Sequence, residues 1–536
     1  MKLTDKNDLK FSLLILVLYS AILLCSEVLY RYVFAIPPIT RYLESYLILF
    51  ILLSLYYFSK YKVTRFLIVG FYFLCIVVNN VHYQIYQSWI NGTNYFLMLK
   101  EVSEVAHTGL PMYGKWIMNV IWGCIDVAIF ISIARFRKKS WPVADTLFIL
   151  SMIYIFIRSY HTSQELGISP NANYSRVKAN YFSFGYFIGR VLPYHALSLS
   201  DIPEYSYPMP KVKAEPEIKN IIFIMGESES ASHVSYFGYK RETTPFLNKL
   251  AQAHPDSVIK QTYSAGFMTA VSLPLFFNAI PHPNGMLQMM KGDTNLFNLA
   301  KQQHYQTYFY SSQPENQMMI MNLIGKAWID TLRFPTNEGY KISELMPDKK
   351  LLPHLYAINL DEGNNFIVLH QRGSHGVYGE ALTEEEKIFG KKPIDEYDNT
   401  IYNTDRIIEQ VYNYLSQRKQ QDWILIYTSD HGQNVTDKVQ NQGTLAEASY
   451  VVPLVIFSPN TQLQQKINAV FNTCKIAYHQ QLATLLINLM GYDMPVSTCE
   501  QGVVTGNFVT GDAGYLKIYP DGHSEYIYPT KGRIKN

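Results

Sequence analysis

Long apolar runs are concentrated in the first third of the chain. Five segments before residue 160 are long and apolar enough to cross a bilayer, namely residues 11–30, 42–58, 66–83, 117–133 and 143–157. The first run has no small-residue cleavage site at its end and four more runs follow it, which argues against a secretory signal peptide. The pattern therefore predicts an N-terminal transmembrane domain of five helices over residues 1–160.

Beyond residue 215 the pattern changes to short apolar runs that alternate with amphipathic stretches. Runs typical of buried strands lie at residues 219–225, 306–310, 365–369, 423–427 and 451–457. Helical patterns lie at residues 245–253, 294–303, 400–418 and 480–490. This alternation predicts a three-layer (αβα) domain of the α/β class over residues 216–536. The turn-rich residues 161–215 are expected to form a bridge along the membrane surface and a linker.

The distribution of basic residues predicts which side of the membrane each part occupies. Lysine and arginine cluster before the first run, between the second and third runs, and between the fourth and fifth runs, all on one side of a five-span topology. Basic loops tend to stay cytoplasmic, so residues after about 160 are expected on the external face. The net charge of +3 is small and no basic stripe is visible, so a nucleic-acid partner is not expected.

Polar residues stand directly after two of the predicted strands. Glu227 follows the run 219–225, and Asp430 with His431 follows the run 423–427. Because parallel strands end at one edge of a sheet, these side chains are expected to meet although they lie far apart in sequence. Two carboxylates and one imidazole suit Zn²⁺ and can also accept Mn²⁺. The plainer interpretation is that Asp430 opens a turn and His431 is exposed.

Two further segments carry hydroxyl or imidazole side chains that could take part in catalysis. The stretch SAGFMTAVSLP, residues 264–274, offers the hydroxyls of Ser264, Thr269 and Ser272 in a turn that opens a helix, where a hydroxyl either caps the helix or serves as a nucleophile. The predicted strand 365–369 runs into HQRGSHG, which contains His370 and His375. These imidazoles could bind phosphate or protonate a leaving oxygen, or they could simply be satisfied by neighbouring backbone groups.

A few polar residues interrupt the apolar runs. Glu27, Asn80 and Asp126 either bond to neighbouring helices or line a pocket for a lipid head group. The external loop 88–116, which carries Glu104, could roof such a pocket. In the external part only Cys474 and Cys499 are cysteines, and a disulfide between them suits an oxidising compartment, with two free thiols as the alternative.

Taken together, these segments resemble the phosphoethanolamine transferases of Gram-negative bacteria, in the alkaline phosphatase and sulfatase superfamily. The resemblance covers essentially the whole chain and rests on six motifs in order: GES at 226–228, HVSYFGYKRETTP at 233–245, SAGFMTAVSLP at 264–274, VLHQRGSHG at 368–376, YDNTIYNTD at 397–405 and SDHG at 429–432. It implies a multi-pass protein of the bacterial inner membrane with its catalytic domain in the periplasm.

The resemblance also implies roles for particular residues. Thr269 would be the nucleophile that becomes phosphoethanolaminated, and it would join Glu227, Asp430 and His431 around Zn²⁺. His375 would contact the transferred group or assist the leaving oxygen. The implied donor is phosphatidylethanolamine, and the acceptor is an envelope glycan or the lipid A or core part of lipopolysaccharide. His370, Gln442 and Glu104 are candidates for substrate binding.

The sequence departs from the family pattern in three places. Gln442 stands where well-known members have a histidine, Ala265 and Leu275 stand near positions where some members have cysteines, and the segment after Tyr310 lacks a lysine of the lipid A enzymes. Gln442 argues against a second metal site, though not against the central zinc, and the missing lysine argues for a different branch with a different acceptor.

Two other functions fit parts of the pattern. A lipoteichoic-acid-synthase-like transferase, which moves glycerol phosphate, also combines five spans with a sulfatase-like domain. A non-catalytic domain that binds lipid or glycan would explain the change at Gln442, but it would have no need of the complete set Glu227, Thr269, His375, Asp430 and His431.

Overall fold

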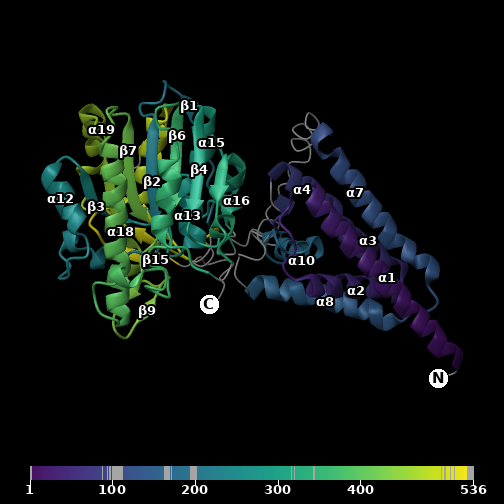
Figure 1. The fold of residues 1–536 in the computed structure, drawn as a ribbon. Helices are drawn as coiled ribbons and strands as arrows, with labels where there is room; N and C mark the ends of the chain where they lie inside the picture. Colours follow the sequence, from purple (N-terminus) through teal and green to yellow (C-terminus); the bar gives the residue numbers. More distant parts are fainter. Residues whose placement is uncertain are drawn as a thin grey trace. The chain divides into compact units, whose positions relative to one another are not determined.

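The computed structural model describes residues 3–161 and 170–527, apart from residues 87–88, 93, 96–97, 99–112, 171, 193–201, 316, 319, 342–343, 497, 500–501, 507–508 and 512–513. The chain folds into two compact units, Met1–Leu199 and Ser200–Asn536. Figure 1 shows a helical N-terminal unit and a C-terminal unit built around a β-sheet.

The N-terminal unit consists of helices. They are α1 (Leu3–Val33), α2 (Tyr42–Phe58), α3 (Lys62–Phe73) continuing through η1 (Leu74–Val78) into α4 (Asn79–Tyr86), α7 (Tyr113–Ser132), α8 (Pro142–His161), and α10 (Arg176–Tyr186) continuing into η4 (Phe187–Val191). Within the described residues, three helical segments are long and apolar enough to cross a membrane, Asp8–Val33, Lys62–Gln84 and Ile117–Phe136, and α2 is a shorter apolar helix. These four segments and α8 coincide with the five predicted runs.

A buried polar network joins the helices of this unit. The Glu27 carboxylate accepts hydrogen bonds from Arg31 (3.1 Å) and from the backbone N–H of Arg176 (2.9 Å). The Arg176 guanidinium, only 1% exposed, donates to Asn80 (2.8 Å) and Asp126 (2.9 Å). The polar residues of the predicted spans thus form hydrogen bonds between helices, which is the first of the two interpretations that the sequence allowed. Through Arg176 they also attach α10 to the apolar helices.

The C-terminal unit contains an eight-stranded sheet with the order β11-β3-β10-β7-β2-β6-β4-β5. The strands are β2 (Asn220–Gly226), β3 (Val258–Tyr263), β4 (Tyr305–Ser311), β5 (Thr331–Arg333), β6 (Asn364–His370), β7 (Trp423–Ser429), β10 (Val451–Phe457) and β11 (Ala477–Tyr478). The strands β7, β2, β6, β4 and β5 run parallel, whereas β10 is antiparallel to both β7 and β3. The central strands β2 and β7 are buried throughout, which explains their continuous apolar sequences.

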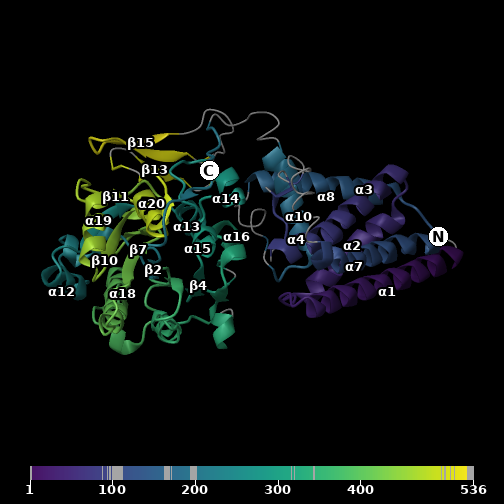
Figure 2. The same cartoon turned by 90° about the horizontal axis from the view of Figure 1, so that it is seen from above.

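Helices cover both faces of the sheet. Successive residues of β2, such as Phe223 and Ile224, enter different hydrophobic cores because neighbouring side chains of a strand point to opposite faces. One core includes α13 (Thr269–Phe277), α15 (Leu296–Gln302), α19 (Thr461–Phe471) and α20 (His479–Leu489); the other includes α12 (Pro245–Ala253), α17 (Leu352–Tyr356) and α18 (Pro393–Ser416). Figure 2 shows α13 and α20 on one side of the central strands and α18 on the other. The predicted three-layer α/β arrangement is confirmed.

Smaller elements complete this unit. They are the short helices α14 (Met286–Lys291) and α16 (Met321–Ile324), the paired strands β1 (Lys211–Val212) and β12 (Tyr492–Asp493), the hairpin β8 (Asn434–Val435) and β9 (Gln440–Asn441), and the sheet β13 (Gly502–Thr505), β14 (Tyr515–Ile518) and β15 (Ser524–Ile527). Part of the predicted linker is held along the unit, because Gln288 bonds to both the backbone N–H (2.7 Å) and the carbonyl (3.1 Å) of Tyr207.

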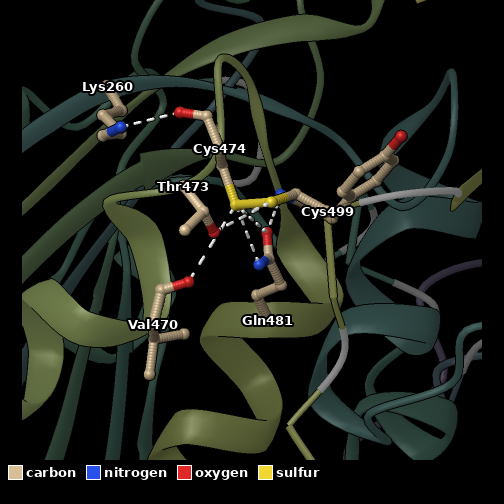
Figure 3. The surroundings of a disulfide bond; sticks show 7 residues. Lys260, Val470, Thr473, Cys474, Gln481 and Cys499 are labelled. Carbon is tan, nitrogen blue, oxygen red and sulfur yellow. Dashed lines mark hydrogen bonds between the residues drawn. A yellow bond between two sulfur atoms is a disulfide. The ribbon is translucent and has the colours of Figure 1, made fainter. Parts of the chain in front are cut away.

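Cys474 and Cys499 form a disulfide, as the sequence predicts (Figure 3). Cys474 lies just after α19, and its backbone carbonyl accepts a hydrogen bond from Lys260 (2.7 Å) on β3. The Gln481 amide on α20 donates to its sulfur (3.2 Å). The disulfide therefore links the segment after β12 to the segment between α19 and α20.

We expect Cys499→Ser to lower the free energy of unfolding of the C-terminal unit by about 3 kcal/mol, because the disulfide restricts the unfolded chain. Thermal unfolding of the full chain in detergent, with and without a reducing agent, measures this loss. Reduction should destabilise the wild type and leave Cys499→Ser unchanged. A wild type indifferent to reduction would contradict the prediction.

Candidate metal and nucleophile site

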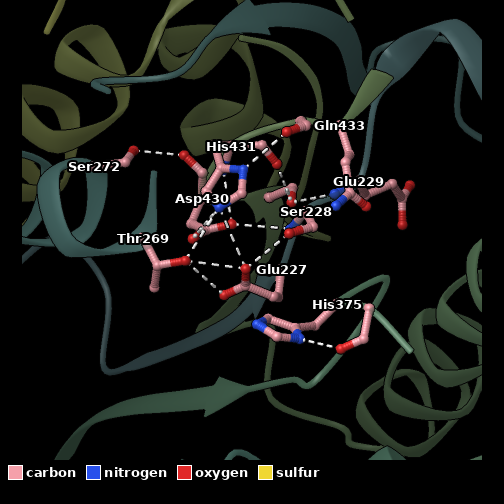
Figure 4. A network of polar contacts seen from close by, with 12 residues as sticks. Glu227, Ser228, Glu229, Thr269, Ser272, His375, Asp430, His431 and Gln433 are labelled. Carbon is pink, nitrogen blue, oxygen red and sulfur yellow. Dashed lines mark hydrogen bonds and ion pairs between the residues drawn. The ribbon is translucent and has the colours of Figure 1, made fainter. Parts of the chain in front are cut away.

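The site forms at the carboxyl edge of the parallel strands. β2 and β7 are neighbours, and their last residues, Gly226 and Ser429, are paired in register. Glu227 and Asp430 therefore leave the sheet side by side, and His431 follows at once. All three side chains are 0% exposed. The predicted convergence of these residues is what the structure shows (Figure 4).

The ligand atoms of these residues surround one point. His431 Nε2 lies 3.3 Å from Glu227 Oε1 and 3.5 Å from Asp430 Oδ2. The hydroxyl of Thr269, at the start of α13, lies 3.0 Å from Glu227 Oε1 and 3.1 Å from His431 Nε2. Four potential ligand atoms are thus clustered, and Thr269 is the only one of the four residues that is not fully buried.

This cluster fits a tetrahedral metal ion. Ligand atoms at about 2.0–2.1 Å from such an ion stand roughly 3.3 Å apart, close to the separations between these four groups. Asp430 Oδ2 is buried and has no hydrogen-bond partner among the described residues. A buried carboxylate oxygen without a partner is costly, and a cation supplies the missing interaction.

The electrostatics of the cluster also favour a cation. Burial and the charge of Glu227 raise the pKa of Asp430. Burial would raise the pKa of Glu227 as well, but the hydrogen bond and charge of His431 outweigh it and lower that pKa. Burial would lower the pKa of His431, yet Asp430 and Glu227 raise it to about 9. Without a metal ion the site therefore retains protons that an ion must displace.

We expect the affinity of the protein for Zn²⁺ to rise with pH. Binding requires neutral His431 and ionised Asp430, and both have raised pKa values, so each unit of pH favours the binding-competent form. Displacement of one proton gives about tenfold per pH unit, or on the order of 100-fold between pH 6 and 8. Competition with a chelator of known affinity measures this slope, and an affinity independent of pH would contradict the prediction.

Main-chain contacts hold the turn that carries Thr269. The backbone N–H of Ser264 donates to the Tyr450 carbonyl (2.9 Å), and that of Ala265 donates to His479 Nδ1 (3.2 Å). Thr505, at the end of β13, both donates to the Ala265 carbonyl (3.0 Å) and accepts from the Phe267 N–H (3.1 Å). Thr269 is then the first residue of α13, and its side chain faces the cluster instead of capping the helix.

His375 lies beside the cluster. Its Nδ1 is 2.5 Å from the Gly376 carbonyl, so Nδ1 carries the hydrogen and Nε2 remains available (Figure 4). The backbone of this loop touches the metal-ligand loop, because Ser374 N–H donates to the Glu227 carbonyl (2.9 Å). Gly373 has φ of +52°, and a Cβ there would stand 2.9 Å from the backbone nitrogen and oxygen of Glu227. Only glycine fits this close approach.

Two of the three remaining candidates, His370 and Gln442, are described, and neither belongs to the cluster. His370 is 0% exposed, with Nδ1 2.9 Å from the Ser311 hydroxyl, and burial lowers its pKa to about 4. Gln442 lies in the turn after β9 and is partly exposed. Glu104 lies outside the described residues.

Sequence reasoning missed residues that orient the predicted ones. The Gln313 amide donates to Glu227 Oε2 (2.8 Å), leaving Oε1 to face His431. The backbone N–H of Ser228 donates to Asp430 Oδ1 (3.0 Å), which leaves Oδ2 for a cation. Gln313 follows β4, so the strand-end rule that identified Glu227 and Asp430 could also have found it.

Comparison with known proteins places this site in a wider context. The sequence model of the family described as Sulfatase matches residues 219–492. The Kdo(2)-lipid A phosphoethanolamine 7''-transferase of Escherichia coli (strain K12) is 26% identical over 269 residues, which cover 46% of this chain and 46% of that protein. Phosphoethanolamine transferase EptA of the same strain is 26% identical over 277 residues, covering 45% of each. In both cases the matched segment spans less than half of the relative's own length.

Among solved structures, the integral membrane lipooligosaccharide phosphoethanolamine transferase A (EptA) from Neisseria meningitidis is similar over 90% of this chain and 95% of its own. The sequence identity is 18% and the TM-score is 0.45.

Proposed function

Because this chain belongs to the sulfatase family, we propose that it transfers phosphoethanolamine from phosphatidylethanolamine to an envelope glycan or lipopolysaccharide acceptor through a covalent intermediate on Thr269. The observation that carries the proposal is the partly exposed Thr269 hydroxyl, 3.0 Å from Glu227 and 3.1 Å from His431 in an otherwise buried metal-type cluster. Two relatives are named as phosphoethanolamine transferases, which supports the choice of transferred group.

In the first half-reaction the Thr269 oxygen attacks the phosphorus of the donor. Glu227 accepts the hydrogen bond of the hydroxyl and orients a lone pair toward the phosphorus. The bond from phosphorus to the diacylglycerol oxygen breaks. The Thr269 proton passes to water, and the diacylglycerol oxygen takes a proton from the imidazolium form of His375, which carries a second hydrogen on Nε2 and recovers it from water. Glu227, Thr269, Asp430 and His431 would hold a zinc ion, whose positive charge would lower the pKa of the attacking hydroxyl and stabilise charge on the phosphoryl oxygens.

In the second half-reaction a hydroxyl or phosphate of the acceptor attacks the same phosphorus. The bond to Thr269 breaks, and the free threonine hydroxyl is regenerated between Glu227 and His431. The apolar helices of the N-terminal unit suit a lipid donor, because they would hold the protein in the inner membrane where that donor resides. The C-terminal unit would then lie in the periplasm.

Intact mass of the purified full chain, incubated with zinc and phosphatidylethanolamine without an acceptor, tests the proposal. We expect a phosphoethanolamine adduct that peptide mapping places on Thr269. A glycerol phosphate adduct, formed from phosphatidylglycerol instead, would overturn the proposed donor. Absence of any adduct with zinc bound would overturn the covalent mechanism.

A further inference from the structure

His479 connects the turn that carries Thr269 to the strand that carries the metal-type ligands. It is the first residue of α20 and only 1% exposed. On one side Nδ1 accepts the backbone N–H of Ala265, in the Thr269 turn (3.2 Å). On the other side Nε2 lies 3.1 Å from the Thr428 hydroxyl, on β7 two residues before Asp430.

The hydrogen bonds of His479 define one tautomer. Because Nδ1 accepts from Ala265, the ring hydrogen must be on Nε2, which then donates to the Thr428 oxygen. The Thr428 hydroxyl gives its own hydrogen to the Pro453 carbonyl (2.8 Å), so it can accept. Burial lowers the pKa of His479 to about 3, which keeps this neutral form across the physiological range. The ring also packs edge-on against Phe276 of α13, with centroids 5.3 Å apart.

These contacts give His479 a position that the other supports of the turn lack. Tyr450 and Thr505 hold the turn through their own backbone groups. His479 touches the turn, the helix that Thr269 begins, and β7, which ends at the ligands. A shift of this ring would therefore move Thr269 relative to Asp430 and His431.

We propose that His479 is a positioning residue for the transfer reaction: it sets the Thr269 oxygen at its distance from His431 by bridging Ala265 and Thr428. The inference rests on the proposed function for its kinetic part, but the geometry it predicts exists whether or not the chain is a transferase. A displacement of about 1 Å in a reacting group can cost on the order of 100-fold in rate.

Two substitutions cut the bridge at opposite ends. In His479→Asn the amide oxygen takes the place of Nδ1 and can accept from Ala265, but the link to Thr428 is lost. In His479→Gln the longer amide reaches Thr428, and the buried N–H of Ala265 is left without an acceptor. We expect adduct formation at Thr269 to slow by about 10-fold in the Asn variant and about 100-fold in the Gln variant, with wild-type zinc content.

His254→Gln is the matched control. His254 is also hydrogen-bonded through Nε2, to the Tyr412 hydroxyl (2.7 Å), and packs against the Phe457 ring, but it does not contact the turn. Each variant is assayed well below its measured unfolding temperature, so that a loss of stability does not enter the comparison of rates. A purely structural role for His479 predicts that folded His479→Gln reacts at the rate of His254→Gln.

A second readout does not depend on turnover. Co²⁺ can replace Zn²⁺, and its visible absorption depends on the geometry of its ligands. We expect the spectrum of His479→Gln to move toward that of Thr269→Ala, while His254→Gln keeps the wild-type spectrum. An unchanged His479→Gln spectrum would overturn the positioning role. A wild type that forms no adduct would overturn the proposed function, and the cobalt spectra would still decide the role of His479.

Discussion

Replacement of Thr269 by alanine is expected to lower phosphoethanolamine transfer on the order of 10⁴-fold or more, because the attacking oxygen is removed. The buried groups Glu227, Asp430 and His431 remain, so the variant should still bind zinc, with lower affinity. Loss of the hydroxyl leaves no buried partner unpaired, since Gln313 and Ser228 still bond to Glu227. The rate of product formation and the metal content of the same preparation give the two quantities.

Thr269→Ser is the control for this substitution, because it keeps the hydroxyl and removes only a methyl group. It should retain a measurable fraction of the activity and form the adduct on serine. If Thr269→Ala transferred phosphoethanolamine at the wild-type rate, a direct attack by the acceptor on the lipid would replace the covalent mechanism.

The second large effect is expected for Asp430→Asn, which should abolish activity and yet stabilise the metal-free protein. Zinc affinity should fall by more than about 100-fold. Loss of a residue that only orients a ligand costs up to about 100-fold in metal affinity, and loss of a ligand itself should cost more. In the metal-free state burial and the charge of Glu227 raise the pKa of Asp430, so the ionised form of Asp430 costs free energy. Asparagine has no charge to bury beside Glu227, so the substitution should raise the free energy of unfolding of the metal-free protein by roughly 1–3 kcal/mol at pH 8.

Thermal unfolding with a chelator and with excess zinc tests both halves of this prediction. The wild type should gain stability from zinc, and Asp430→Asn should not. The amide oxygen of asparagine can keep the bond from Ser228 N–H that Asp430 Oδ1 accepts, so the loop itself is preserved. A variant less stable than the metal-free wild type would show that the carboxylate stabilises the fold without a cation.

The sequence predicted the buried part of the fold best. The strand β10 was predicted with its observed bounds, and β7 begins where the apolar run begins at Trp423, because fully buried strands are continuously apolar. The strand β3 was missed, since VIKQTY is only partly buried and carries polar residues. The four-residue strands of the β13-β14-β15 sheet were missed for the same reason. The helix α18 begins earlier than expected, at Pro393, because its polar first turn has the composition of a loop.

The part of the candidate site that lies directly after parallel strands could be predicted from the sequence. Glu227, Asp430 and His431 follow parallel strands directly, so the topology of the sheet alone brings them together. The pattern of its turn made Thr269 one of several candidate hydroxyls, and only the resemblance to a known family singled it out as the nucleophile. His479 could not be found in either way. Its role depends on where α20 begins relative to β7 and the turn, and that relation is set by packing across more than 200 residues of sequence.

The close approach of Gly373 to Glu227 has a consequence for the evolution of the site. The loop that presents His375 and the loop that presents Glu227 share one backbone contact with no room for a side chain. Substitution of Gly373 by any residue with a Cβ is therefore excluded on steric grounds. In a saturation library at this codon, glycine should be recovered almost alone among active clones. A change of acceptor specificity would then have to come from substitutions at other positions, with the backbone contact between Gly373 and Glu227 kept.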